Sequence, residues 1–194
     1  MARIIDISKM ERVKETAIQM VVEKGYGGAS IATIAKKAGV AEGYLYRFYK
    51  GKEELVVDLL CNKVNEIADE LELLLQRCNR VADVVSLLVK KIFQIAENNP
   101  DHIKFLYVLM HDYNFKIGDR ERERIFKLCR EIKNIGSNSG EIGEFITEED
   151  IYMLVNIFPI QFINLRIKNF FGNKSWDNTD KEHIIEIIIK TLKA

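Results

Sequence analysis

Apolar residues recur along most of the chain at steps of three and four, the spacing that places them on one face of an α-helix. Sustained alternation of apolar and polar residues, as expected for a strand, does not compete with this pattern. Only two prolines occur in 194 residues, and long intervals with few breakers favour helices. The pattern predicts an all-α fold of about nine helices, over residues 8–24, 31–38, 41–48, 52–77, 84–98, 101–113, 119–135, 147–171 and 179–193.

Residues that start and stop helices support these boundaries. Ser30 is expected to cap the second helix, and Gly39 is expected to end it in a left-handed conformation. Pro159 lies inside the helix expected over 147–171, so it should kink that helix or mark the first turn of a new segment. The stretch GSNSGEIGEF, residues 136–145, is the clearest predicted loop.

Composition describes an ordinary globular chain, with 47% hydrophobic and 30% charged residues. The longest uncharged run, residues 151–165, is shorter than the roughly 20 apolar residues that a membrane-spanning helix needs. The first residues lack the apolar core of a signal peptide. Three cysteines without CxxC spacing indicate free thiols in a reducing compartment. We therefore expect a cytoplasmic protein without membrane contact, metal or cofactor.

Charge is unevenly distributed along a chain whose net charge is zero. Residues 1–52 carry ten Lys or Arg and five Asp or Glu, a net charge of +5, and the remainder carries −5. A basic head on an acidic body is what contact with nucleic acid at one end would need. Asymmetry of this size also occurs in proteins that bind no polyanion, so it supports the hypothesis without deciding it.

The stretch AKKAGVAEGYLYRFY, residues 35–49, has the spacing of a helix-turn-helix. Two short helices that cross closely need a small residue on the first, a left-handed turn residue after it, and a branched apolar residue on the second. Ala35, Gly39 and Leu45 meet these three requirements in order. An αα-corner with a purely structural role would show the same spacing, so both interpretations remain open on this motif alone.

The surrounding residues resemble the N-terminal region of the TetR family of bacterial transcriptional repressors, over about residues 8–60. The resemblance rests on Gly25-Tyr26, on Ile34-Ala35 followed by Ala38-Gly39-Val40, on Gly43, on Leu45-Tyr46 followed by Tyr49, and on Lys52-Glu53 followed by Leu55. Beyond residue 60 the similarity lies only in length and helical content. The resemblance implies that the third helix enters the major groove of DNA.

The residues expected to contact DNA lie on the second and third helices and at the start of the fourth. Tyr44 and Tyr46 can place hydroxyls on phosphates and rings against thymine methyls or sugars. At Lys52, backbone amides and the ammonium can hold a phosphate, and the resemblance implies the same contact. The full predicted set is Ser30, Thr33, Lys37, Glu42, Gly43, Tyr44, Tyr46, Arg47, Lys50 and Lys52.

Four positions stand out against the family's usual pattern. Ala41 replaces a Ser or Thr, so the third helix loses a side-chain cap worth about 1 kcal/mol. Glu42 either stabilises the helix dipole away from the DNA backbone or accepts a hydrogen bond from a cytosine amino group. Tyr44 replaces a smaller residue, so operator preference cannot be carried over from relatives. Tyr49, where the family usually has Phe, is expected in the core.

A dimer is expected because two heads about 34–36 Å apart read a palindrome that one head cannot. In the family, the last two helices, here about 147–171 and 179–193, pack against their symmetry mates as a four-helix bundle. Both helices carry dense apolar stripes with many isoleucines. Burial within one subunit would give the same stripes, because periodicity does not distinguish self from partner.

The resemblance also implies an apolar inducer pocket between the head and the dimerisation helices. An aromatic stripe at helical spacing fits plain core as well, and both interpretations remain open for each residue. The candidate pocket residues are Phe93, Tyr107, Met110, His111, Phe126, Phe158, Gln161 and Phe162.

Together these patterns predict a helix-turn-helix DNA-binding domain over 1–52 and a ligand-binding and dimerisation domain over 53–194. The predicted function is a dimeric repressor released from a palindromic operator by a small apolar inducer of unknown identity. The alternatives are a DNA-binding activator or a protein-partnered regulator without a small-molecule ligand. A helical enzyme is a distant alternative, because no HExxH, phosphate loop, nucleophile elbow or paired histidines occur.

Overall fold

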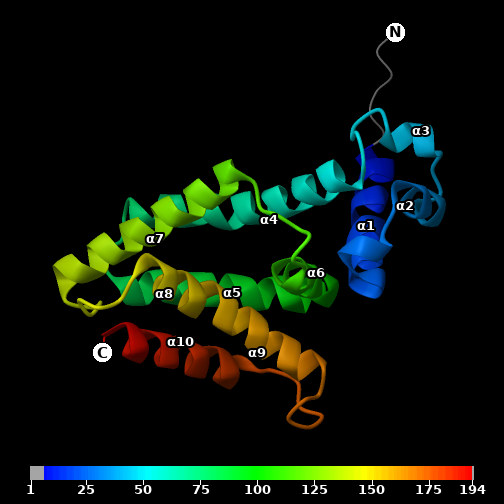
Figure 1. Ribbon diagram of the computed structural model, residues 1–194. Helices are drawn as coiled ribbons and strands as arrows, with labels where there is room; N and C mark the ends of the chain where they lie inside the picture. Colours follow the sequence, from blue (N-terminus) through cyan, green and yellow to red (C-terminus); the bar gives the residue numbers. More distant parts are fainter. Residues whose placement is uncertain (1–6, 194) are drawn as a thin grey trace. The chain divides into compact units, whose positions relative to one another are not determined.

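The computed structural model describes residues 7–193, and residues 1–6, which include Arg3 and Asp6 of the charge count, lie outside it with residue 194. The helices, labelled as in Figure 1, are α1 (Ile7–Gly28), α2 (Ile31–Ala38), α3 (Glu42–Leu45), α4 (Lys52–Leu75), α5 (Val81–Asn98), α6 (Pro100–His111), α7 (Asp119–Ser139), α8 (Glu148–Tyr152), η1 (Met153–Ile157), α9 (Phe158–Ile167) and α10 (Asn178–Lys193). Residues 7–193 contain no strand, and the predicted all-α class is confirmed. When α8, η1 and α9 are counted as one continuous helix, these residues form nine helices, as expected.

The π-helical segment η1 shows how the chain accommodates Pro159. Proline donates no backbone hydrogen bond, and its ring crowds the carbonyl four residues earlier. The Phe158 amide accordingly donates to the carbonyl of Met153, five residues back, while the backbone stays helical on both sides. Pro159 then occupies the first turn of α9, where a missing donor is tolerated. The chain therefore accommodates Pro159 by a change of hydrogen-bond pattern within one continuous helix, with Pro159 in the first turn of α9.

The chain forms two compact units. Among the described residues, the first unit comprises 7–63 with 104–117, and the second comprises 64–103 with 118–193. Helices α4 and α6 each contribute residues to both units. The predicted domain boundary between residues 52 and 53 stays a prediction.

In the first unit, the apolar stripes of α1, α2 and α4 are buried. Val13, Ala17 and Val21 of α1 are fully buried, as are Leu55 and Val56 near the start of α4. Each of the larger side chains contributes about 1.5–3 kcal/mol on burial. The stripe therefore holds the first turns of α4 in the same core as α1.

In the second unit, α5 is the central helix and contacts α7, η1, α9 and α10 (Figure 1). Its apolar side chains Val84, Val85, Val89 and Phe93 are fully buried. The C-terminal end of α10 is held in this unit by a 2.8 Å hydrogen bond from the Gly143 amide to the Leu192 carbonyl. A helix surrounded on several sides needs apolar residues over most of its surface, and α5 supplies them.

Several predicted boundaries were wrong, including the end of the helix expected over 147–171, which stops at Ile167. The third helix is regular only over Glu42–Leu45, and residues 46–48 continue as turns instead of helix to residue 48. Helix α6 ends at His111 and not at residue 113. Residues 136–139, expected as loop, are the last residues of α7, which ends with Gly140 in the left-handed region at φ 70°.

Gly136 lies near the end of α7, within the glycine-rich stretch that was expected to be a loop. It is buried, and a Cβ built on it would lie 2.3 Å from Cγ1 of Ile142. The amides of Glu141 and Ile142 both donate to its carbonyl, so the chain folds back tightly over the end of α7. The glycine therefore permits a close approach of the Ile142 side chain, and its role is packing.

We expect Gly136→Ala to lower the free energy of unfolding by about 1–3 kcal/mol, because the added methyl overlaps Ile142. Urea denaturation followed by circular dichroism measures the effect. Gly27→Ala, at a site with open space around the added Cβ, is the matched control. The loss should shrink in an Ile142→Ala background, and an equal loss in that background would contradict the proposed overlap.

Arg124 of α7 binds three polar residues of α4. Its guanidinium donates to the side chains of Asn65, Asp69 and Glu72, with Nε 3.1 Å from Oε1 of Glu72. Most of the Arg124 side chain is covered, and hydrogen bonding to Arg124 holds the pKa of Glu72 below its usual range. The stabilisation from a lowered carboxyl pKa is present above the unfolded-state pKa and is lost as pH falls.

We expect Arg124→Ala to reduce stability by about 1–2 kcal/mol, because several charge-assisted hydrogen bonds are lost together. Thermal unfolding at low and high salt measures the effect, and the difference from wild type should narrow at high salt. Lys127→Ala, on the same helix but highly exposed and paired only with Glu131, is the control and should change little. Equal losses of stability in the two variants would show that the Arg124 hydrogen bonds contribute no more than an exposed ion pair.

Candidate nucleic-acid interface

Helix α2 begins with a complete capping box. The Ser30 side chain accepts a 3.2 Å hydrogen bond from the Thr33 amide, and the Thr33 hydroxyl accepts a 3.1 Å bond from the Ser30 amide. The two hydroxyls also lie 2.9 Å apart. The expected Ser30 cap is confirmed, and its partner Thr33 was missed because the sequence motif for a capping box has Glu or Gln in that position. Contacts of these hydroxyls with DNA would compete with the cap.

The turn between α2 and α3 has the predicted geometry. Gly39 adopts φ 68° and ψ 38°, the left-handed region in which a glycine carries no steric cost. Its amide and that of Val40 donate to the last carbonyls of α2, which ends the helix. Ala35 and Leu45 are both fully buried, so the small residue and the branched residue occupy the crossing as expected.

The first two residues of α3 and the two residues that follow the helix are exposed. Glu42, Gly43 and Arg47 are open to solvent, and 57% of the Tyr46 surface is accessible. Tyr44 is half-buried, and its ring contacts Phe48 edge to face at 5.2 Å between centroids. An exposed face of this kind is free to enter a groove, while Leu45 anchors the helix from below.

The N-terminus of α3 lacks a side-chain cap. Ala41 occupies the cap position with φ −70° and ψ 144° and offers no acceptor for the first amides of α3. Glu42 follows directly, where a negative charge suits the helix dipole. The absence of a side-chain cap agrees with the sequence prediction for Ala41. A base contact by Glu42 stays a prediction.

We expect Ala41→Ser to raise the stability of the first unit by about 0.5–1 kcal/mol, because the backbone already has the extended geometry of a capping residue. Differential scanning calorimetry gives the change in midpoint. Ala32→Ser, at an exposed position inside α2, is the control and should be neutral or slightly destabilising. A stabilisation shared by both variants would exclude capping as its cause.

The basic residues of the predicted set differ in their partners. Lys37 is paired with Glu23 of α1 at 2.8 Å, and the Lys52 ammonium donates to the Tyr26 carbonyl at 2.7 Å. Lys50 is exposed, and within residues 7–193 neither it nor Arg47 has a carboxylate partner for its side chain. The Arg47 guanidinium lies 5.7 Å from the centroid of the Phe48 ring. Two cations of the set are thus free for an external anion.

Tyr26, which precedes α2, and Tyr49, which follows α3, are both buried. Tyr49 is buried, as expected, and its hydroxyl donates to Oδ2 of Asp58 at 2.9 Å. Burial, followed by the bond to Asp58, raises the Tyr49 pKa above its ordinary value. Tyr26 contacts Phe115 edge to face at 5.4 Å between centroids, and burial, with the nearby Glu53 and Asp112, raises the Tyr26 pKa. Both phenols stay neutral at physiological pH.

The candidate pocket residues fall into two groups, one in each compact unit. In the second unit, the fully buried Phe93 ring lies 6.1 Å from that of Phe162 and 6.5 Å from that of Trp176, between centroids. Trp176 was missed because it lies in the loop after α9, outside any helical stripe. Phe158 and Gln161 are half-buried.

The other candidates differ in exposure. In the first unit, the rings of Tyr107 and His111 stack at 4.1 Å, and Nδ1 of His111 lies 2.8 Å from the Tyr107 carbonyl oxygen. Met110 in that unit and Phe126 in the second are each 38% exposed. The structure therefore brings Phe93 together with Phe162, and Tyr107 together with His111.

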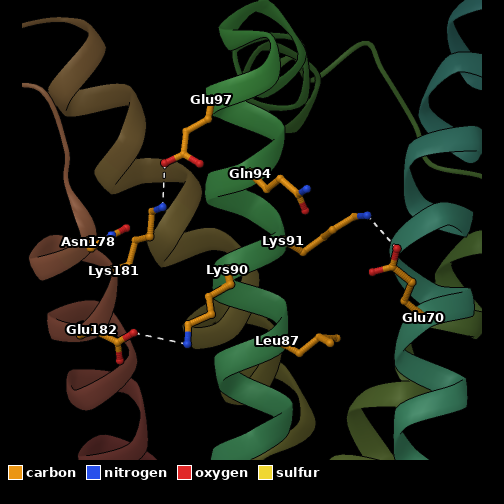
Figure 2. A pocket seen from close by; sticks show the side chains of 9 residues that line it. All are labelled: Glu70, Leu87, Lys90, Lys91, Gln94, Glu97, Asn178, Lys181 and Glu182. Carbon is orange, nitrogen blue, oxygen red and sulfur yellow. Dashed lines mark hydrogen bonds and ion pairs between the residues drawn. The ribbon is translucent and has the colours of Figure 1, made fainter.

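A charged groove of about 570 Å³ lies along α5, with α4 on one side and α10 on the other (Figure 2). Lys90 and Lys91 diverge from α5, the first to Glu182 of α10 at 3.3 Å and the second to Glu70 of α4 at 2.7 Å. Lys181 in turn pairs with Glu97 at 2.7 Å. The lysines of this groove are neutralised by carboxylates, which makes it a poor match for the predicted apolar effector.

The isoleucine stripe of α10 is buried against helices of the same chain. Ile184, Ile185 and Ile188 are buried in the second unit, where α10 packs against α5. The opposite face of α10 is polar and includes the Glu186–Lys190 ion pair. The alternative of burial within one subunit therefore accounts for these three residues, whereas Met153 of η1 remains 55% exposed.

No helix within residues 7–193 has both the length and the apolar character needed to cross a bilayer. In the same residues, no group of three His, Cys, Asp or Glu side chains is placed to hold a metal ion.

Comparison with known proteins connects the head to a family. Residues 15–59 match the family model described as "Bacterial regulatory proteins, tetR family". The chain is also similar to the "Fatty acid metabolism regulator protein" of Bacillus subtilis (strain 168), at 31% identity over 64 residues. That match covers 33% of this chain and 33% of the relative, so the sequence similarity spans about a third of the relative's length.

Solved structures extend the similarity to nearly the whole fold. A TetR family transcription regulator from Marinobacter aquaeolei VT8 matches with a TM-score of 0.79 at 17% identity, covering 96% of each chain. The transcriptional regulator FadR from Bacillus subtilis, in complex with stearoyl-CoA, matches with a TM-score of 0.68 at 19% identity. The second match covers 93% of this chain and 97% of the other. Both structures share this chain's all-helical fold.

Proposed function

We propose that this chain, which belongs to the TetR family of bacterial regulatory proteins, is a dimeric, sequence-specific DNA-binding transcriptional regulator. The observation that carries the proposal is the helix-turn-helix of α2 and α3, which lies inside the matched residues and exposes the start of α3 together with Tyr46 and Arg47. The family consists of transcriptional regulators and not of enzymes. Such a regulator acts in the cytoplasm, where bacterial DNA lies.

In this proposal α3 enters the major groove, and each exposed group has a distinct role. Gly43, with no side chain, lets the helix approach a sugar-phosphate strand closely. Tyr44 and Tyr46 reach base edges or sugars, while Arg47 and Lys50 bind phosphates. The backbone amides at the start of α4 add a further phosphate contact, because a helix N-terminus attracts anions.

We assign the dimer contact chiefly to the continuous helix of α8, η1 and α9. It keeps apolar side chains that the second unit does not fully cover, including Met153, Tyr152, Ile157 and Leu165. A second copy of the same helix can cover such a row in a two-fold arrangement. The contribution of α10 is smaller, because its isoleucines are largely buried within the chain.

The proposed effector is a small molecule with a large apolar part, and the proposed activity is repression relieved by that effector. Support comes from the FadR structure, which shares the fold and was solved with stearoyl-CoA. The aromatic cluster of Phe93, Phe162 and Trp176 offers an apolar wall inside the second unit. The effector releases DNA only if it binds the released state more tightly than the DNA-bound state.

The test is selection of genomic fragments from the source bacterium by the purified protein, followed by footprinting. We expect a protected palindrome with half-sites about one helical turn apart and two protomers per site by light scattering. Tyr44→Ala should change the ranking of operator variants by about tenfold at the contacted base pairs. Lys36→Ala, an exposed cation on α2, should weaken all variants equally. Absence of any protected site would overturn the proposal.

The same complexes test the effector. Stearoyl-CoA is added to the bound DNA, and free coenzyme A serves as the control without an apolar chain. Release by the acyl compound alone supports an apolar effector, and repression is then measured with a reporter. If neither stearoyl-CoA nor a metabolite extract releases DNA, the alternative applies: a regulator that answers to a protein partner instead of a small molecule.

A further inference from the structure

The side chain of Lys52, the first residue of α4, is directed at Tyr26 and engaged there twice. Its ammonium donates to the Tyr26 carbonyl at 2.7 Å and lies 4.3 Å from the centroid of the Tyr26 ring. A carbonyl in the last turn of a helix has no intrahelical donor, and Tyr26 lies in the last residues of α1. The Lys52 ammonium satisfies this acceptor and gains a cation–π contact with the same residue.

Tyr26 is itself held firmly. Only 8% of it is accessible, and Phe115 contacts the edge of its ring within the same compact unit. Gly25, with φ 71°, turns the backbone so that residues after the regular part of α1 run in a new direction. The carbonyl that Lys52 binds is thus presented by a fixed and buried residue.

The contact closes the helix-turn-helix at its base. Residues 27–51, which include α2 and α3, form a segment whose two ends are joined by the bond between Lys52 and Tyr26. The exposed end of that segment is α3. The position of α3 relative to α1 and α4 therefore rests in part on this bond, in addition to the buried Leu45.

Other cations nearby are better placed for an external anion. Lys50 is exposed, and neither its ammonium nor the Arg47 guanidinium has a carboxylate partner within residues 7–193. Two glutamates, Glu53 and Glu54, directly follow Lys52 at the start of α4. The Tyr26 carbonyl engages one of the three donors of the Lys52 ammonium, and a phosphate bound there would lie beside these negative charges.

We infer that Lys52 is a positioning residue, whose ammonium joins the end of α1 to the start of α4, and that Arg47 and Lys50 supply the ionic phosphate contacts. The assignment of phosphate contacts rests on the proposed DNA binding, whereas the Lys52–Tyr26 contact can be tested in its absence. This role belongs to the Lys52 side chain alone, and the Lys52 backbone amide remains available for a phosphate at the N-terminus of α4.

The experiment compares Lys52→Met with Lys50→Met, two changes that remove one charge and keep the aliphatic stem. Thermal unfolding is measured on the DNA-free protein, and the dependence of Kd on salt is measured on one selected DNA fragment. Lys52→Met should lower the unfolding midpoint and weaken binding by about fivefold or more at every salt concentration, without changing the salt slope. Lys50→Met should leave the midpoint unchanged and reduce the slope by about one ion.

Two further variants keep the test decisive. Lys52→Arg retains a cation over the Tyr26 ring and should restore most of the stability and affinity. Tyr26→Leu combined with Lys52→Met should destabilise somewhat less than the sum of the single changes, because both remove the cation–π contact, although Tyr26→Leu keeps the backbone carbonyl. Fully additive effects would exclude a contribution of the cation–π contact, and no recovery with Arg would overturn the positioning role.

The outcomes distinguish this inference from the proposed function. A slope reduced by about one ion in Lys52→Met, with an unchanged midpoint, would make Lys52 a phosphate contact and overturn the inference. Failure of the wild-type protein to bind any DNA fragment would overturn the proposed function and the phosphate assignments with it. In that case the unfolding midpoints still decide whether Lys52 stabilises the helix-turn-helix.

Discussion

The left-handed turn at Gly39 sets the angle at which α2 and α3 cross. A residue with a Cβ is strained at φ 68°, and a larger residue than Ala35 would separate the two helices at their crossing. Once the turn is made, Leu45 is directed into the core, Tyr44 is half-buried, and Glu42 and Gly43 face solvent. The exposure of Tyr46, Arg47 and Lys50 is thus a consequence of one backbone conformation, because α3 is too short to be stable without this crossing.

Many of the lysine and arginine side chains of this protein pair with carboxylates of the same chain. Lysines in the groove beside α5 bind glutamates of α4 and α10, and Arg124 binds acids of α4. In the head, Lys37 and Lys52 are likewise engaged by groups of the chain itself. Net charge therefore overstates the number of cations available to a polyanion. Arg47 and Lys50, which have no carboxylate partner within residues 7–193, lie just after α3, where the proposed phosphate contacts would need them.

In the second unit, the apolar stripe of a helix does not indicate which surface covers it. The isoleucines of α10 satisfy the pattern of a dimer helix and are nevertheless buried against α5. Pro159 would interrupt an ordinary helix, yet the preceding π-helical segment keeps α8 and α9 continuous. That continuity leaves a long helix with uncovered apolar residues such as Met153, the surface to which the proposed dimer contact is assigned.

Local rules in the sequence were enough to determine the helical class, most helix limits, the Ser30 cap, the turn at Gly39 and the family of the head. Each of these follows from residues within a few positions of one another, where backbone preferences dominate. Only the tertiary structure showed that Gly136 accommodates Ile142, that Glu141 supplies the acceptor for the first amide of α5, and that Lys52 is bound to Tyr26. The last two contacts join residues 60 and 26 positions apart, and no periodicity records which distant groups will meet when the core closes.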